Sequence, residues 1–313
     1  MFTSPRTGAT GAIAAILLLA ACSAGASPSA STATQSTAAS PTTAPTPVAS
    51  VPSDQLVEAG NLFVCIDIPY PPQEAFDDSG QPVGSDVDIS AGIAQRLGLK
   101  FDGAHVQNTV FAVIIPALAG NKCDIIVSAQ NINADRLKQV DMIPYFKAGQ
   151  AVVVLSGNPK GIKVKDDLCG KSVAAENGTT EVDFLQGTGD YQGAGLSDAC
   201  VKAGKPAITI KTFDKDSDAL LALQSQTVDA YFADSPAAGY AVDKSGGKLE
   251  LSGITLEEAI EGISVAKNHT ALRDAVKAAL LAMMSDGTYT KILTKWGVQD
   301  GAITPDQVTS GKL

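Results

Sequence analysis

The amino-acid sequence predicts an α/β fold with two lobes and mostly parallel sheets. Short apolar or β-branched runs alternate along the chain with longer amphipathic stretches, which is the pattern of strands followed by helices. Residues 54–313 are also more numerous than a usual single domain requires, and this length favours two lobes over one. Residues 1–53 differ sharply in composition and are expected to lie outside both lobes.

The strands and helices follow from the local sequence pattern. The predicted strands are 62–67, 124–128, 151–155, 172–176, 207–210, 229–234 and 262–266. The predicted helices are 86–97, 110–118, 180–186, 216–224, 236–243, 270–285 and 289–296. Ser85 with Asp86 and Gly178 with Thr179 are start signals for two of these helices, and Gly98 is a stop signal.

The N-terminus is predicted to be an export signal followed by a lipid anchor. Residues 1–21 carry one charge, at Arg6, and an apolar core shorter than the roughly 20 residues of a membrane span. They end in Leu-Ala-Ala before Cys22, which resembles the lipobox of bacterial lipoproteins, so Cys22 is expected to be acylated. Residues 22–53 are rich in Ala, Ser, Thr and Pro and predict a disordered tether. The body is therefore expected outside the cytoplasm, anchored to the outer face of the cell membrane.

Charge and histidine content exclude several kinds of partner. The formal net charge is −10 and no basic cluster occurs, so nucleic acid and anionic lipid headgroups are poor candidates. The two histidines, His105 and His269, are far apart in the sequence and lack the spacing of metal ligands. No metal site and no cofactor are predicted.

Four cysteines follow Cys22 in a chain that is predicted to be exported, where disulfides persist. Cys169 and Cys200 flank a polar, Gly-rich segment and are predicted to form a disulfide. Cys65 and Cys123 lie in or beside apolar runs of two predicted strands. For this second pair, a disulfide and two buried free thiols remain equal alternatives.

Polar residues follow four of the predicted strands. Asp67 ends the first of them, Ser128 ends the second, Glu176 ends the fourth and Asp234 ends the sixth. Ligands of open α/β sheets bind at the carboxyl ends of the strands. Each residue alone could be a helix cap or a turn residue, but the four together indicate a binding site.

Two further features suit an anionic group of a ligand. Thr179 and Thr180 open a predicted helix, whose free N–H groups attract negative charge. Arg136 follows the strand that ends at Ser128 and can grip a carboxylate with two parallel hydrogen bonds. Asp234 then requires a cation, because a buried carboxylate without a partner is costly. The combination matches the α-carboxylate and α-ammonium groups of an amino acid.

Several motifs, in this order, resemble the bacterial extracellular solute-binding proteins of family 3. The motifs are Cys-Ile-Asp-Ile-Pro-Tyr at 65–70, Pro-Val-Gly-Ser-Asp-Val-Asp at 82–88, the helix at 111–119, Asp-Arg-Leu-Lys-Gln-Val-Asp at 135–141, Gly-Thr-Thr at 178–180, Ala-Asp-Ser at 233–235 and residues 286–296. The resemblance covers the chain from about residue 56 to the C-terminus. It implies two α/β lobes of the periplasmic-binding-protein type, joined by two crossing strands, with a ligand cleft between them.

The resemblance also implies roles for individual residues. Tyr70 and Phe111 match the aromatic lids, Arg136 matches the carboxylate-binding Arg, and Asp234 matches the ammonium-binding acid. Thr179 and Thr180 match the helix-start amides, Ser128 matches a strand-end carbonyl, and Ala129 and Asn131 form the neighbouring wall. The implied lobes are 54–148 with 262–313, and 149–261. The implied partners are the membrane permease subunits of an ABC importer, with the binding protein as a monomer and not an enzyme.

The charge balance of the implied cleft favours a basic ligand. Asp67, Glu176 and Asp234 face Arg136 alone, so a zwitterion would leave up to two carboxylates without a counterion. Arginine, ornithine, lysine or an opine-like derivative would neutralise them. Alternatively, Asp67 or Glu176 meets a backbone N–H or a Lys, and the ligand is glutamine or another uncharged amino acid. Two other classes stay open: a dehydratase on the same fold, and a ligand-sensing subunit without a transport role.

Overall fold

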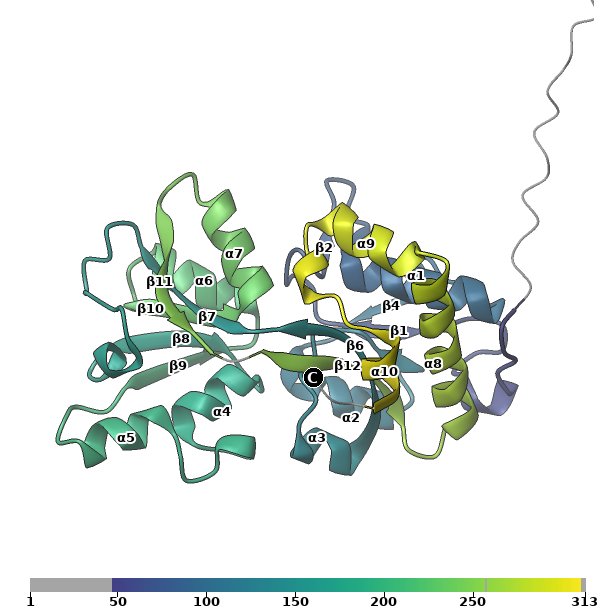
Figure 1. The fold of residues 1–313 in the computed structure, drawn as a ribbon, viewed down its shortest axis with the longest axis horizontal. Helices are drawn as coiled ribbons and strands as arrows, with labels where there is room; N and C mark the ends of the chain where they lie inside the picture. The colour runs from purple at the N-terminus through teal and green to yellow at the C-terminus, as the bar shows by residue number, and fades with distance from the viewer. Residues whose placement is uncertain (1–46, 257, 311–313) are drawn as a thin grey trace, which may run out of the picture. The chain divides into compact units, whose positions relative to one another are not determined.

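The computed structural model describes residues 47–256 and 258–310, and their strands form two five-stranded sheets and a short two-stranded one (Figure 1). The sheet of lobe one has the order β4-β1-β5-β12-β6, and that of lobe two has the order β11-β7-β10-β8-β9. Lobe one contains β1 (Val64–Ile66), β4 (Val106–Asn108), β5 (Ile125–Ile126), β6 (Val140–Ala148) and β12 (Ala259–Ala266), with β2 (Ala75–Phe76) and β3 (Pro82–Val83) as a separate hairpin. Lobe two contains β7 (Gln150–Leu155), β8 (Ser172–Glu176), β9 (Thr209–Phe213), β10 (Ala230–Asp234) and β11 (Leu249–Thr255).

Helices pack on both lobes, as expected of an α/β fold. Those of lobe one are α1 (Ser85–Leu97), α2 (Ile114–Ala119), α3 (Ala134–Gln139), α8 (Thr270–Ser285), α9 (Thr288–Trp296) and α10 (Pro305–Ser310). Those of lobe two are α4 (Thr180–Gln186), α5 (Leu196–Lys202), α6 (Asp216–Gln224) and α7 (Ser235–Lys244). All seven predicted helices are present within a few residues, although residues 111–113 form a 3₁₀ turn before α2.

The expectation of mostly parallel sheets is wrong. β1 pairs in parallel with β4 and β5, and β8 with β9 and β10. The pairs β5–β12, β6–β12, β7–β10 and β7–β11 are antiparallel, so the two kinds are equal in number. Each of these antiparallel pairs contains at least one of the four strands that connect the lobes: β6 leads directly into β7, and β11 leads into β12.

The lobes are joined at two crossings. The chain leaves lobe one between Ala148, which ends β6, and Gln150, which begins β7, and it returns between Thr255 and Ala259. The expected return at residue 262 therefore falls inside β12, because Ala259–Glu261 already pair with β6. The Lys147 ammonium and the Glu258 carboxylate form an ion pair 2.5 Å long that links the two crossings.

The body begins earlier than the expected tether boundary at residue 53. The backbone N–H of Val48 donates to the carbonyl of Arg96 at 2.8 Å, and Ala49 and Val51 pack against the core of lobe one. The residues before them are mostly small or polar, whereas these apolar side chains can be buried against lobe one, so this segment packs beside α1. The signal at 1–21, the lipidation site Cys22 and the tether up to residue 46 lie outside the described residues.

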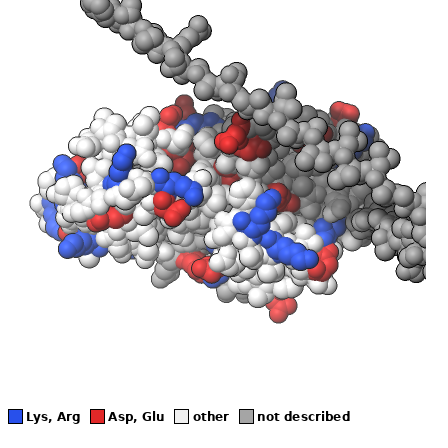
Figure 2. Space-filling view, turned by 90° about the horizontal axis from the view of Figure 1, so that it is seen from above, with Lys and Arg blue, Asp and Glu red and all other residues white. Residues whose placement is uncertain are grey.

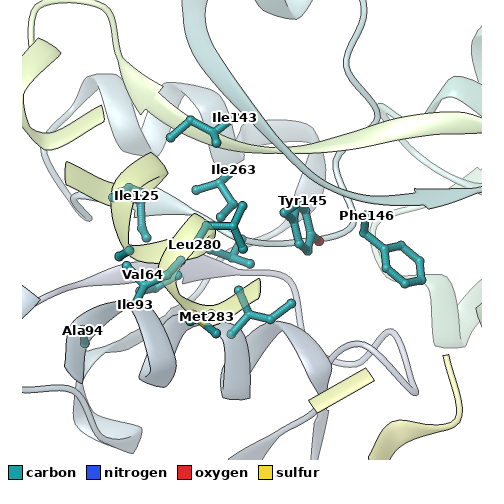
Figure 3. Packing of buried hydrophobic residues seen from close by; sticks show 14 of the residues in the cluster. Val64, Ile93, Ala94, Ile125, Ile143, Tyr145, Phe146, Ile263, Leu280 and Met283 are labelled. Atoms are coloured by element: carbon teal, nitrogen blue, oxygen red, sulfur yellow. The ribbon is translucent and has the colours of Figure 1, made fainter. Parts of the chain in front are cut away.

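The core of lobe one is a layer of aliphatic side chains between the sheet and two helices. Figure 3 shows Ile125, Ile143 and Ile263 of the sheet beside Leu280 and Met283 of α8, all buried.

Both cysteine pairs are disulfides: the predicted Cys169–Cys200 and also Cys65–Cys123, which the sequence left open. The second bridge ties β1 to the start of β5 and closes a 58-residue separation, worth about 4 kcal/mol in the chain-entropy model.

Charged side chains of both signs lie on the surface of the body. On the face drawn in Figure 2, the visible Lys and Arg side chains are interspersed with Asp and Glu. None of the helices in residues 47–256 and 258–310 is long and apolar enough to span a membrane.

Candidate functional site

All eleven residues proposed from the sequence to contact a ligand line one pocket between the lobes. They are Asp67, Tyr70, Phe111, Ser128, Ala129, Asn131, Arg136, Glu176, Thr179, Thr180 and Asp234. Glu74 and Glu181 also line the pocket, and the sequence reasoning missed both. The cavity that these side chains leave has a volume of about 10 Å³, which is room for about one water molecule. A free amino acid is several times larger, so its entry requires the lobes to separate.

The strand ends place the acidic groups of the pocket. Asp234 ends β10 and precedes α7, where Pro236 occupies the first turn, and its side chain makes no capping hydrogen bond to that helix. Instead its carboxylate accepts from the Tyr70 hydroxyl at 3.2 Å and from the Asn131 amide at 3.5 Å. Burial raises the pKa of Asp234 to about 6, although these two hydrogen bonds act in the opposite direction. The carboxylate of Asp234 is thus turned into the pocket.

Arg136 is placed by the cap of α3. The Asn133 side chain accepts from the backbone N–H of Arg136 at 2.8 Å, which begins the helix and directs the guanidinium toward lobe two. That group donates to the carbonyls of Asn131 at 2.7 Å and Gly178 at 3.1 Å, and its Cζ lies 5.2 Å from the centre of the Phe111 ring. The described structure contains no hydrogen bond or ion pair between Arg136 and Asp234, although both line the same pocket.

The hydroxyls at the start of α4 are partly engaged by other side chains. Thr180 accepts from the amide groups of Asn131 at 2.9 Å and Gln150 at 2.7 Å, and Thr179 donates to the carbonyl of Glu176 at 2.8 Å. Gly178 makes the turn from β8 into this helix with φ +83°, a conformation that glycine adopts without strain. Asn131 and Gly178 thus connect the two lobes beside Arg136.

Asp67 is satisfied within the chain. One of its oxygens accepts from the backbone N–H of Phe111 at 2.6 Å, and the other forms an ion pair with Lys215. Lys215 was missed from the sequence because the predicted strand 207–210 ended too early. β9 extends to Phe213, which brings Lys215 to the carboxyl end of the sheet. The expectation that Arg136 alone balances the acidic groups is therefore wrong.

Glu176 lies beside Asp67, although the two residues belong to opposite lobes. It accepts from the backbone N–H of Asp216 at 3.1 Å. Burial, together with the neighbouring carboxylates of Asp67 and Asp216, raises the pKa of Glu176 to about 10, and Lys215 acts in the opposite direction. Contact between the lobes therefore brings two carboxyl groups together with one lysine.

The pocket as a whole is rich in carboxyl groups. Asp67, Glu74, Glu176, Glu181 and Asp234 line it together with one guanidinium, and Lys215 contacts Asp67. Burial raises the pKa values of Glu74 and Glu181 well above their usual range, and nearby carboxylates add to the effect. Both residues could be missed because Glu74 lies in a loop and Glu181 resembles an ordinary first-turn acid. Within residues 47–256 and 258–310, no cluster of His, Cys, Asp or Glu has the geometry of a metal site.

Comparison with known proteins identifies the kind of molecule that has this pocket. The family model of bacterial extracellular solute-binding proteins, family 3, matches residues 62–299. The chain belongs to this family. Its body is accordingly that of an extracellular solute-binding protein with two α/β lobes.

Relatives of this solute-binding protein carry names of several amino-acid binders. It is 28% identical over 264 residues to the arginine-binding protein ArgT of Corynebacterium glutamicum, covering 84% of this chain and 82% of that protein. It is 27% identical to the L-cystine-binding protein TcyJ of Escherichia coli, covering 78% and 85%, and 30% identical to the glutamine-binding protein GlnH of Bacillus subtilis, covering 72% and 76%.

Solved structures agree on the fold of this solute-binding protein. An ancestral arginine-binding protein bound to arginine has a TM-score of 0.67 and 35% identity, covering 76% of this chain and 98% of that one. An ancestral amino acid-binding protein described as a precursor of cyclohexadienyl dehydratase has a TM-score of 0.63 and 31% identity, covering 76% and 95%. The predicted fold class and family are confirmed.

Proposed function

We propose that this protein is the substrate-binding lipoprotein of an ABC importer and that it captures a basic amino acid or derivative, such as arginine, ornithine, lysine or an opine. The observation that carries the ligand class is the approach of Asp67 and Glu176 from opposite lobes. Two carboxyl groups in a buried site repel each other when both are ionised, and Lys215 supplies one positive charge for the pair. A cationic side chain of a bound ligand would take over this role at the pair of acids.

The two ends of the amino acid would be held at the other side of the pocket. Arg136 and the start of α4, at Thr179 and Thr180, are proposed to bind the α-carboxylate, because a guanidinium forms strong paired hydrogen bonds with carboxylates. Asp234 is proposed to accept the α-ammonium, together with the strand-end carbonyl of Ser128. Tyr70 and Phe111 would cover the ligand from lobe one, with Ala129 and Asn131 as the adjoining wall.

Binding would couple to movement of the lobes. Solute would enter while the lobes are apart, and closure about the two crossings would bury it, giving the form that the permease subunits recognise. No covalent chemistry is needed, so we propose a transport role rather than an enzymatic one. Acylation at Cys22 would keep a monomeric binding protein at the outer face of the membrane, near its importer. Labelling with palmitate, lost in Cys22→Ser, tests the anchor.

A second ligand class has one specific observation in its favour. Because Lys215 already pairs with Asp67, a glutamine side chain would enter a pocket with one acidic group neutralised. The relatives likewise include proteins named for arginine and for glutamine. The carboxyl groups of the pocket favour the basic ligand for a different reason: the raised pKa values keep Glu74, Glu176 and Glu181 protonated near neutral pH, and a ligand cation beside Glu176 and Asp67 would stabilise their ionised forms.

Calorimetric titration with a panel of amino acids tests the proposal. The panel contains arginine, lysine, ornithine, octopine, glutamine, glutamate and cystine. We expect the basic compounds to bind most tightly and glutamine more weakly. Tight binding of glutamate without binding of arginine would refute the proposal of a basic ligand. Absence of binding by every compound in the panel would refute the proposal that the protein captures an amino acid. Growth on the bound solute after deletion of the gene separates import from sensing.

A further inference from the structure

Lys215 is placed to act on both lobes. It is the last residue before α6 of lobe two, yet its ammonium reaches three oxygen acceptors of lobe one. These are the carboxylate of Asp67, the carbonyl of Ile68 at 3.1 Å and the side-chain oxygen of Asn108 at 3.1 Å. An ammonium group has three N–H donors, so these three acceptors satisfy it completely.

The acceptors of Lys215 are also held by contacts within lobe one. The second oxygen of Asp67 is held by the backbone N–H of Phe111 at 2.6 Å. The Asn108 side chain accepts from the N–H of Ile68 at 3.1 Å and donates to its carbonyl at 3.3 Å, which fixes the direction of its oxygen. Lobe one therefore presents a preformed cation site at Asp67, which lines the candidate pocket.

Lys215 itself is less firmly held than the acid that it contacts. Its side chain is 25% exposed, whereas that of Asp67 is 4% exposed. A lysine on a flexible stem can withdraw to water when another cation replaces it at Asp67, whereas the Asp67 side chain remains in the pocket. The cation at this site is thus exchangeable and the carboxylate is fixed.

We propose that Lys215 is an internal competitor of the ligand: it occupies the cation site at Asp67 when the lobes are in contact and must leave it for the cationic side chain of a basic amino acid. This inference rests on the proposed function and adds a specificity-determining residue to it. Lys215 would lower the affinity for basic ligands selectively, because only these need Asp67. An uncharged ligand such as glutamine would leave the Lys215–Asp67 pair in place.

The test is calorimetric titration of the full chain with arginine and with glutamine, comparing Lys215→Met with the unaltered protein. Met keeps the length of the side chain and removes the charge. The ratio of arginine affinity to glutamine affinity should rise about tenfold or more, the scale of one charge-assisted hydrogen bond. Lys211→Met is the matched control, because Lys211 is an exposed lysine of β9 whose ammonium donates to Thr227 within lobe two. Its ratio should not change.

A double-mutant cycle separates competition from a general effect on the lobes. In an Asp67→Asn background, Lys215→Met should leave the ratio unchanged, because the shared partner is gone. Should the Met variant fail to fold, Lys215→Gln replaces it, and retained glutamine binding reports folding. An arginine affinity that falls or stays constant, equal gains for both ligands, or a gain that persists without Asp67 would overturn the proposal. Absence of binding by any amino acid to the unaltered protein would instead refute the proposed function.

Discussion

Tyr70 and Asp234 are joined twice across the two lobes. The Tyr70 hydroxyl donates to the carboxylate of Asp234 at 3.2 Å and accepts from the backbone N–H of Asp234 at 2.9 Å. The Tyr70 hydroxyl is thus hydrogen-bonded to the carboxylate that we propose to bind the α-ammonium group of the ligand. A bound amino acid must share or replace this contact, so the same residue pair links lobe contact to ligand recognition.

The role of Asp234 can be tested by removing its charge. Asp234→Asn should weaken binding of arginine by about 2 kcal/mol or more, because an ammonium would be left in a buried site without its counterion. The same compound lacking the α-amine should lose much less. Titrations of both compounds provide the comparison, and equal losses for the two would contradict the assigned role.

Arg136→Ala should weaken every ligand that carries an α-carboxylate. We expect a loss of about 2 to 5 kcal/mol, because the carboxylate would be buried without its charged partner. Arg273→Ala is the matched control, since Arg273 of α8 pairs with Asp141 of β6 and with Asp274, apart from the pocket residues. Calorimetry on both variants decides the matter: an Arg136→Ala protein that binds as tightly as Arg273→Ala would exclude Arg136 from the site.

The strand-end residues that line the pocket could be picked out from the sequence because strand ends are local features. Asp67, Ser128, Glu176 and Asp234 each follow a short apolar run, and parallel strands bring such ends to one edge of a sheet. β8 and β10 are almost wholly buried, so both appear in the sequence as continuous apolar runs that end at a polar residue. Parallel pairing accounts for Asp67 beside Ser128 and for Glu176 beside Asp234, and the contact between the lobes brings these two pairs into one pocket.

The features that were missed depend on weaker or non-local signals. β9 is an edge strand whose residues are mostly exposed, so its end and the position of Lys215 were not apparent. β6 contains Pro144, which argues against a strand, but an edge strand tolerates proline because one side of it needs no partner. The Cys65–Cys123 bridge requires β1 and β5 to be neighbours, and sequence spacing cannot establish that.

Stability should fall as the pH rises from about 4 to about 7, because of buried acids in lobe one. Burial raises the pKa of Asp86 from 3.8 to about 7 despite hydrogen bonds from Tyr145 and Ala129, and the pKa values of Glu74 and Glu261 are raised as well. Below pH 3.8 the Asp86 carboxyl is protonated in both states. Between 3.8 and 7 the unfolded chain releases this proton and the folded protein keeps it, so the free energy of unfolding decreases. Above pH 7 the Asp86 carboxyl is ionised in both states, and its contribution to the pH dependence ends.

Urea denaturation at pH 5 and pH 8 checks this pH dependence. Asp86→Asn should lose less stability between these two values than the unaltered protein, because one of the groups that titrate is gone. Asp78→Asn, at an exposed turn position, is the control and should follow the unaltered protein. A decrease of the same size in Asp86→Asn would show that the Asp86 carboxyl does not hold a proton in the folded state.

Contact between the lobes depends on the absence of a side chain at Gly178. A Cβ atom at this position would lie 2.9 Å from the Cα of Ala112 in lobe one, which is closer than real contacts allow. Gly178→Ala should therefore hold the lobes apart and weaken arginine binding about tenfold or more, which corresponds to roughly 1.4 kcal/mol.

Gly157→Ala separates this effect from backbone strain, because Gly157 has a similar φ of +77° and no atom within 4 Å of its added Cβ. Both variants should lose about 1 to 2 kcal/mol of stability, because alanine is strained in a left-handed backbone conformation. Only Gly178→Ala should also bind arginine more weakly. With ligand present, only this variant should show a larger radius of gyration by X-ray scattering. Equal affinities in the two variants would mean that the ligand is bound without the lobe contact seen at Gly178.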